Sequence, residues 1–123
     1  MAKQRPRVLK SGISYTPAKT KNYETLVKEI YITQVNKWIE GQIKLEVNAY
    51  FSIPKSASKR KREAMLSGEI RPVKRPDWDN IGKIISDALN GIAYHDDSQV
   101  VEAVTRKWYS DRPRVEVELG EVG

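Results

Sequence analysis

Several residue types that build reactive sites are missing or scarce in this chain. There is no cysteine among its 123 residues, which excludes disulfide bonds, cysteine-ligated zinc and thiol catalysis. The single histidine, His95, cannot form a multi-histidine metal site, and a Ser-His triad would depend on it alone. No apolar run approaches the ~20 residues of a membrane helix, and no charged-then-apolar leader opens the chain. We therefore expect a cytoplasmic, single-domain protein that does not enter a membrane.

Acidic residues are scarce in the first part of the chain and abundant in the last. Residues 1–76 carry 17 basic and 6 acidic side chains, whereas residues 77–123 carry 5 and 10. A basic surface attracts polyanions, although any one cluster alone is more simply explained as a solvated face. Basic clusters followed directly by an acidic one favour an enzyme that binds phosphates beside metal ions. The basic clusters are Lys3, Arg5, Arg7 and Lys10; Lys55, Lys59, Arg60, Lys61 and Arg62; and Arg71, Lys74 and Arg75.

The spacing of apolar residues predicts helices and strands in succession. Thr16-Pro17 is typical of a helix start, and Gly41 is a natural end for that helix. Residues 43–53 alternate as a strand that ends at Pro54, and residues 57–67 form a short basic helix closed by Gly68. The apolar side of the first helix consists of Tyr23, Leu26, Val27, Ile30, Tyr31 and Trp38.

The second half of the chain predicts one more helix and two strands. A helix begins at Asp77-Trp78 and ends at Gly91, and residues 99–109 and 113–119 are β segments. Residues 1–14 are basic and show little periodicity. The order of elements indicates an α+β fold over residues 1–123, with a small mixed sheet packed with two or three helices. The apolar face of the last helix consists of Ile81, Ile84, Ile85, Ala88 and Leu89.

A group of acidic residues around this last helix is the candidate metal site. Asp77 and Asp79 lie at its start, and Asp79, Lys83 and Asp87 form an i, i+4, i+8 stripe opposite its apolar face. Mg²⁺ prefers oxygen ligands, usually one or two carboxylates together with substrate phosphate. Further acidic or polar candidates near the site are Asn80, Asp96, Asp97 and Glu102.

Simpler interpretations of these residues remain open. Asp77 or Asp79 would serve equally as a helix N-cap, and the Asp79 stripe as an ordinary ion-pair ladder. Asp96-Asp97-Ser98 would serve as a turn before the next strand. The tryptophans at positions 38, 78 and 108 are expected to pack in or beside the core rather than to stack on bases, with Trp78 exposed between two aspartates.

Residues 75–100 resemble the RusA family of Holliday junction resolvases. The family pattern is approximately P-D-x-D-N, then Lys, then D-A-L-N-G, then an apolar run into D-D-x-Q-[VI]. Every part is present in RPDWDNIGKIISDALNGIAYHDDSQV. Arg5-Pro6-Arg7 and Tyr15-Thr16-Pro17 are similar to the family more weakly. Family members usually carry a β segment ahead of their Arg-Pro-Arg element, whereas this sequence starts almost at that element.

The resemblance implies a function and a set of site residues. Asp77, Asp79 and Asp97 would be the essential carboxylates that hold one or two Mg²⁺ ions, and Lys83 the catalytic lysine. A homodimer would bind four-way DNA junctions and nick two opposed strands, without an organic cofactor. Such enzymes are often carried by phages and prophages. Supporting roles would fall to Asp96, Asp87, Glu102 and Asn80 near the metal, and to Arg5, Arg7, Lys74, Arg75, Lys59 and Arg60 on DNA.

Two other functions fit the same residues. One is a DNA-binding module without catalysis, in which the acidic group is structural. The other is a nuclease that acts on forks, flaps or other branched DNA, because basic clusters bind any phosphate backbone.

Overall fold

The strand predicted over residues 43–53 is the centre of the fold. In the computed structural model, which describes residues 10–15, 23–35 and 37–122, it is β2 (Ile43–Ser52). Every second side chain of β2 from Ile43 to Ala49 is buried, as the alternation predicted. The strand ends two residues before Pro54, which has no N–H to donate to a neighbouring strand.

Four strands form one mixed sheet in the order β1-β4-β2-β3. β3 (Val100–Ser110) pairs in parallel with β2, with Tyr50 opposite Trp108. β4 (Arg114–Glu121) lies antiparallel to β2 on its other side and pairs Val117 with Val47. Two neighbouring parallel strands need a long crossover connection. Here residues 53–99 form the crossover between β2 and β3, and this segment contains two of the α-helices.

The first strand corrects the prediction for the basic segment 1–14. Residues Lys10–Tyr15 form β1, which pairs antiparallel with β4 from Lys10↔Gly120 to Tyr15↔Val115. This short segment has too little alternation to identify as a strand. The unpaired edge of β4 supplies its hydrogen bonds, so tertiary context decides its conformation.

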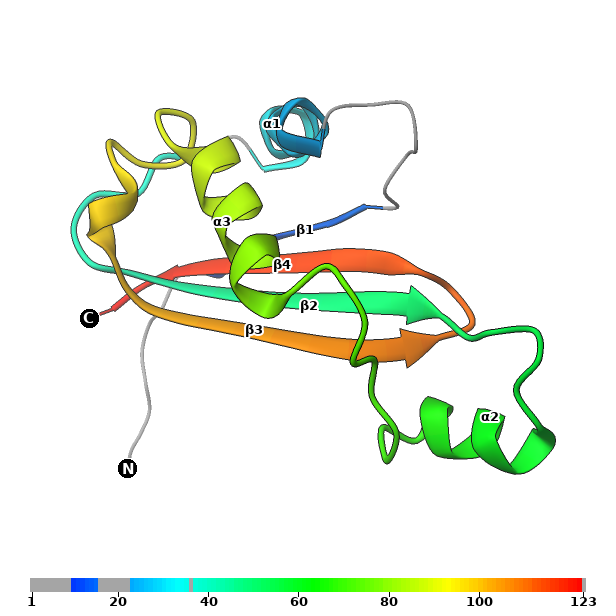
Figure 1. The fold of residues 1–123 in the computed structure, drawn as a ribbon. Coiled ribbons are helices and arrows are strands. Elements are labelled where there is room, and N and C mark those ends of the chain that lie inside the picture. The colour runs from blue at the N-terminus through cyan, green and yellow to red at the C-terminus, as the bar shows by residue number, and fades with distance from the viewer. Residues whose placement is uncertain (1–9, 16–22, 36, 123) are drawn as a thin grey trace.

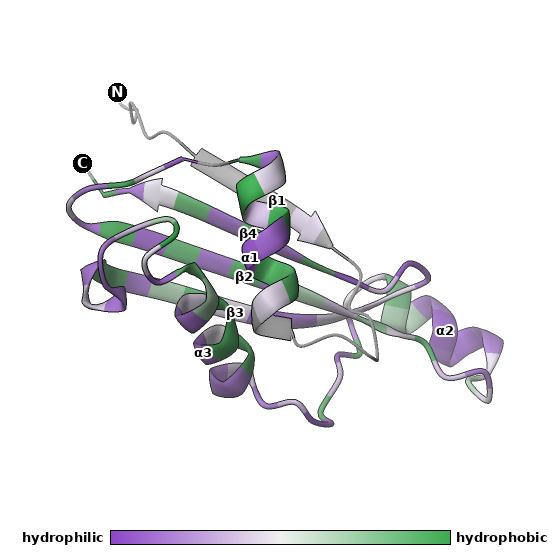
Figure 2. Ribbon diagram, turned by 90° about the horizontal axis from the view of Figure 1, so that it is seen from above, coloured by the Kyte–Doolittle hydropathy of each residue, from purple (hydrophilic) through white to green (hydrophobic). Residues whose placement is uncertain are grey.

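Two helices cover one face of this sheet (Figure 1). α1 (Tyr23–Gln34) and α3 (Trp78–Leu89) lie above it, while no helix of the described residues covers the opposite face. The strands alternate between apolar and polar residues (Figure 2), as a sheet covered on one face requires. The described part of the chain is therefore α+β, with three α-helices and a mixed sheet, as the order of elements predicted.

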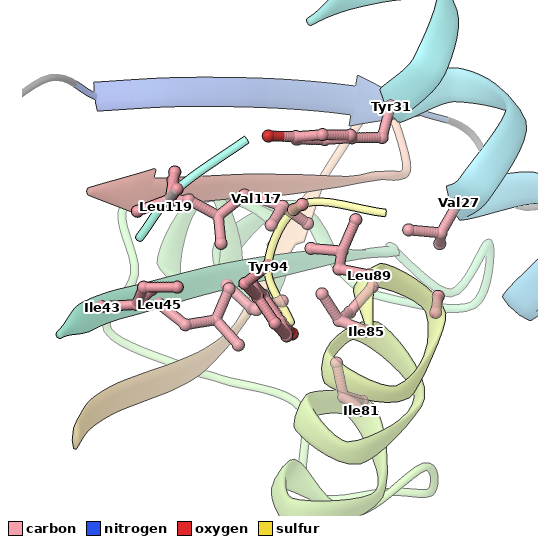
Figure 3. Packing of buried hydrophobic residues seen from close by; sticks show 14 of the residues in the cluster. Val27, Tyr31, Ile43, Leu45, Ile81, Ile85, Leu89, Tyr94, Val117 and Leu119 are labelled. Carbon is pink, nitrogen blue, oxygen red and sulfur yellow. The ribbon is translucent and has the colours of Figure 1, made fainter. Parts of the chain in front are cut away.

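The core lies between these two helices and the sheet (Figure 3). Ile81, Ile85 and Leu89 of α3 point toward the side chains of β2 and β4. Val27 and Tyr31 of α1 close the core on the other side. Burying a large apolar side chain contributes roughly 1.5–3 kcal/mol, so this apolar stripe fixes how α3 lies on the sheet.

The first helix is shorter than the sequence predicted. α1 ends at Gln34, not at Gly41, and Trp38 lies beyond it with 46% of its surface exposed. The Tyr31 hydroxyl donates to the Lys37 carbonyl at 2.8 Å, and the Ile39 N–H donates to the Ala93 carbonyl at 2.8 Å. These two bonds hold residues 37–39 outside the helix, so α1 does not continue for another turn. The predicted start at Thr16-Pro17 lies outside the described residues.

The basic helix after β2 agrees with the prediction. α2 (Lys59–Leu66) begins after Ser58, whose hydroxyl accepts the Lys61 N–H at 3.2 Å, and Gly68 follows with φ +87°. Figure 1 shows α2 beyond the carboxyl ends of β2 and β3. None of the helices in the described part of the chain has the length and apolar character to cross a bilayer.

Gly68 offers a test of how α2 is fastened to the sheet. A Cβ at this position would lie 3.2 Å from the Trp108 ring, whereas one at Gly41, at a similar φ of +79°, would have nothing within 4 Å. Alanine in the left-handed region costs about 1–2 kcal/mol. We expect Gly68→Ala to lower the free energy of unfolding by about 1 kcal/mol more than Gly41→Ala, because the ring must move. Urea denaturation measures both, and equal losses would contradict the packing role of Gly68.

Candidate active site

A cavity of about 890 Å³ opens where the start of α3 meets the sheet. Its walls come from the end of β2, the start of β4 and the first two turns of α3. Asp77, Asp79 and Lys83 all line it, so three of the four predicted catalytic residues share one cavity. The other lining residues are Ala49, Tyr50, Phe51, Arg75, Pro76, Asn80, Ile81, Ile84, Ile85, Pro113 and Val115.

Both carboxylates at the helix start are exposed and available to a ligand. Asp77 occupies the N-cap position with extended backbone angles, φ −71° and ψ 157°, yet its side chain accepts no capping hydrogen bond. Asp79, in the first turn, accepts the neighbouring Asn80 N–H at 2.9 Å. Helix capping therefore does not account for the Asp77 carboxylate. The positive end of the helix dipole favours negative charge at both positions.

Lys83 projects from the same helix one turn after Asp79. It is exposed, and the ion pairs found among the described residues join other side chains, so no ladder ties it to Asp79 or Asp87. The ion-pair interpretation of the stripe is therefore not supported. An unpaired ammonium on the cavity wall beside two carboxylates is free to contact an anion there.

Asp97 and Asp96 lie near the other end of α3. Asp97 begins a short 3₁₀ helix, η1 (Asp97–Gln99), just before β3. Val100 then pairs with Ile43, the first residue of β2, six residues before the cavity wall at Ala49. Asp97 does not line the cavity. Among the described residues, no three acidic or histidine side chains converge closely enough to form a metal cage.

Tyr94 lies among the acids at this end. Its hydroxyl donates to the Ser86 carbonyl at 2.8 Å. Burial, followed by the charges of Asp97, Asp87 and Asp96, raises the pKa of Tyr94 above its ordinary value. The acidic residues thus divide into a pair at the start of α3 and a trio around Tyr94. Lys83 lies between them, one turn from Asp79 and one from Asp87, about 6 Å along the axis from each.

Asp96 has a structural task in this second group. Its carboxylate accepts the Ser98 N–H at 3.1 Å, and the Gln99 side chain accepts the Asp96 N–H at 3.1 Å, which completes a capping box on η1. The Ser98 hydrogen bonds lower the pKa of Asp96. The turn interpretation of Asp96 is therefore correct, whereas Asp97 makes no such cap.

Two other candidates lie away from the cavity. Glu102 forms an ion pair with Lys44 at 3.8 Å, and Lys44 alternates with the buried residues of β2, so the pair lies on the uncovered face of the sheet. His95 lies edge-on against Trp38, with ring centroids 4.7 Å apart, and 3.3 Å from a Glu40 oxygen. Neither residue lines the cavity, so His95 does not act as a base on a ligand bound there.

The connector that leads from α2 into Asp77 (residues 67–76) is fastened to β3 by contacts that sequence reasoning missed. The Arg71 guanidinium lies over the Trp108 ring at 3.7 Å, and its Nε donates to the Lys107 carbonyl at 2.8 Å. Trp108 in turn donates to the Asn48 side chain at 2.9 Å. Arg71 therefore serves to hold the connector rather than to extend the basic cluster. The only sign of these contacts in the sequence was the alternation of residues in the predicted strand 99–109.

The Lys107 ammonium, also missed, donates to the Lys74 carbonyl and lies 5.3 Å from the centre of the Phe51 ring. Lys74 approaches the same ring at 5.8 Å. Phe51 lines the cavity, whereas Lys74 and Lys107 do not, so the cations that the described residues place on its wall are Arg75 and Lys83. Positive charge thus lies beside the carboxylate pair on the same cavity wall, as a phosphate-binding site requires.

The predicted DNA-binding residues are distributed along one end of the sheet. Arg75 is exposed at the cavity, Lys74 is exposed next to it in the chain, and Lys59 and Arg60 are exposed on α2. α2 is largely hydrophilic and lies beyond the strand ends that form the cavity (Figures 1 and 2). Arg5 and Arg7 lie outside the described residues.

Comparison with known proteins agrees with the sequence motif. The chain matches the family "Endodeoxyribonuclease RusA" over residues 1–120. It is also 41% identical over 109 residues to the "Uncharacterized protein YqaN" of Bacillus subtilis (strain 168), a match that covers 86% of this chain and 77% of that protein. The match to the family spans nearly the whole sequence, including the cavity, α2 and both acidic groups. The chain therefore belongs to the RusA family of endodeoxyribonucleases.

Proposed function

We propose that this protein is a homodimeric, Mg²⁺-dependent nuclease that resolves four-way DNA junctions by paired nicks in opposed strands. The observation that carries the proposal is the cavity in which exposed Asp77 and Asp79 share a wall with Lys83 and Arg75. A carboxylate pair beside two cations suits a phosphodiester and a divalent ion bound together. The family membership supplies the reaction class.

The donors at the cavity fit Mg²⁺ as an ion shared with the substrate. Asp77 has no capping bond to compete for its oxygens, and both carboxylates are exposed. Mg²⁺ commonly takes one or two carboxylates and completes its shell with water and phosphate oxygens. An ion bound there would supply Lewis-acid polarisation of the phosphodiester and lower the pKa of a bound water.

The chain's own residues have separate tasks in this proposal. Asp77 and Asp79 hold the ion, and the Lys83 ammonium neutralises charge that develops on the scissile phosphate. Arg75 orients that phosphate, because a guanidinium binds two of its oxygens at once. Asn80 lines the same cavity as the two carboxylates and would support them as ligands of the ion.

We include Asp97 as the third essential carboxylate because the family resemblance implies this role. Asp87 and Asp96 would support Asp97 as neighbouring carboxylates near the metal. Asp96 is already bonded to the Ser98 N–H, and we assign it the task of fixing the backbone at Asp97. Glu102 has the least support as a residue near the metal, because its carboxylate pairs with Lys44.

Basic residues outside the cavity would bind the arms of the junction. Lys59 and Arg60 on α2, Lys74 beside the cavity, and Arg5 and Arg7 would contact phosphates without reading bases. Two-fold symmetry in a homodimer would match the approximate two-fold symmetry of a junction, which gives one cavity for each of two opposed strands.

The decisive experiment compares substrates at one salt concentration. A synthetic four-way junction, a fork and a linear duplex of shared sequence are incubated with the protein, with and without Mg²⁺, and nicks are mapped on each strand. We expect symmetric nicks in opposed strands of the junction only, and none without Mg²⁺. Preferred nicking of the fork would show that the protein acts on another branched substrate. Binding without nicks would show that it is a DNA-binding module without catalysis.

A second expected result concerns α2. Lys59→Gln combined with Arg60→Gln should reduce the dependence of log K on log [salt] by about 2, since each lost phosphate contact removes close to one released counterion. The matched control is Lys28→Gln combined with Lys37→Gln, which removes the same charge from the region of α1. Equal slopes for both double variants and the unaltered protein would exclude α2 from the DNA interface.

A further inference from the structure

Trp78 is a large aromatic side chain that is mostly exposed next to the candidate active site. It lies between Asp77 and Asp79 at the first position of α3, and 67% of its surface is exposed. Its side chain does not line the cavity that both aspartates line, so it projects outward beside that cavity. An exposed indole has a large apolar surface whose burial against a partner is favourable.

We propose that Trp78 is a stacking platform for a nucleobase whose face is uncovered at the branch point of the substrate. This inference rests on the proposed function and deepens it, because it names a residue that distinguishes branched from continuous DNA. Consecutive Cα atoms are about 3.8 Å apart. A phosphate held at the aspartates therefore brings its own or an adjacent nucleotide within reach of the indole.

The charge around Trp78 favours a nucleic acid over an apolar partner. Arg75 and Lys74 lie three and four residues upstream, both exposed, and Lys83 lies on the same helix. A flat aromatic ring among cations and metal-binding carboxylates suits a polyanion with flat, apolar bases. A second copy of the chain would bring the same charges together, which disfavours a self-interface at this position.

Stacking on Trp78 would select for interrupted duplexes. Every internal base of a continuous duplex is covered on both faces by its neighbours, so the indole has no free face to contact. At a branch the stack is interrupted, and uncovering a base costs least where pairing is already broken. Phosphate contacts by α2 would raise affinity for all DNA and fall with salt, whereas stacking would raise affinity for branched DNA at any salt.

The test measures a ratio of affinities without divalent ions, so that no cleavage intervenes. Dissociation constants for a four-way junction and a linear duplex of the same sequence are determined for the unaltered protein, Trp78→Ala, Trp78→Phe and Trp38→Ala. We expect Trp78→Ala to reduce the junction-to-duplex preference by a factor of about 5 to 150, the range for loss of one stacked base. Trp78→Phe should retain most of the preference, and the reduction should be the same at two salt concentrations.

Trp38→Ala is the matched control, because Trp38 is also exposed, at 46%, but lies against His95 and away from the cavity. It should leave the preference unchanged. Thermal unfolding of Trp78→Ala should match the unaltered protein, since the indole is mostly exposed. Should that variant prove unstable, Trp78→Gln, which keeps a long side chain without an aromatic face, replaces it and should lose the preference to the same extent.

Several outcomes would overturn the proposal. They are an unchanged ratio in Trp78→Ala, an equal loss of affinity for junction and duplex, and a changed sedimentation mass of the DNA-free variant, which would assign Trp78 to a self-interface. An unaltered protein without junction preference would overturn it as well. A protein that prefers junctions but never nicks them refutes the proposed nuclease function alone and leaves the ratio test for Trp78 valid.

Discussion

Asp79→Asn is expected to lower the rate of junction cleavage by about three orders of magnitude while junction affinity stays within about threefold. Asparagine keeps the size of the side chain and its ability to accept the Asn80 N–H, but it removes one charged oxygen from the ion site. Lewis-acid stabilisation is worth several kcal/mol, and each 1.36 kcal/mol is a factor of about ten in rate. Single-turnover cleavage with Mg²⁺ and a separate binding titration measure the two quantities.

The control for this variant is Glu121→Gln, which removes an exposed carboxylate from the far end of β4. It should cleave at the unaltered rate. Normal cleavage by Asp79→Asn would refute the metal assignment at the start of α3. Asp97→Asn, tested in parallel, should be as inactive as Asp79→Asn. An active Asp97→Asn would restrict the ion site to the Asp77–Asp79 pair.

Lys83→Ala is expected to reduce the maximal cleavage rate by about 10²- to 10³-fold, with a much smaller loss of junction affinity. The Lys83 ammonium shares the cavity wall with Asp77 and Asp79, and loss of one preorganised donor at developing charge typically costs this much in rate. Rates at saturating enzyme are compared with dissociation constants. The control, Lys37→Ala, removes an exposed ammonium that lies apart from the cavity.

Equal losses in rate and in affinity would make Lys83 a phosphate anchor rather than a transition-state stabiliser. That result would leave the carboxylate assignment intact, because the ion and the ammonium act on different oxygens of the phosphate. The two variants therefore separate the ion site from the cationic wall of the same cavity.

Local patterns were sufficient for most of the fold. The helix that carries the acids was predicted within a residue at its start, because Asp77-Trp78 precedes an apolar stripe of regular spacing and Gly91 follows it. The pattern failed where distant contacts decide the backbone. Strand β1 exists because β4 offers it hydrogen bonds, and α1 stops early because Ile39 bonds to Ala93.

The candidate site was predictable to the extent that one helix carries it. Asp79 and Lys83 are one turn apart on α3 and Asp77 is its N-cap residue, so proximity in the chain brings all three to one wall. Asp97 is joined to them only by the path of the chain after α3, and its position around Tyr94, outside the cavity, could not be read from spacing. The contacts of Arg71 and Lys107 depend on β3 packing against the connector.

The sequence by itself determined the family of this protein, its acidic motif, and the helix and strand that frame the cavity, because each depends on residues close together in the chain. Only the tertiary structure decided that the carboxylates separate into two groups, that Arg71 stacks on Trp108, and that the indole of Trp78 lies outside the cavity that both neighbouring aspartates line. Those facts depend on how segments distant in sequence pack, and packing is governed by shape and burial across the whole sheet rather than by local periodicity.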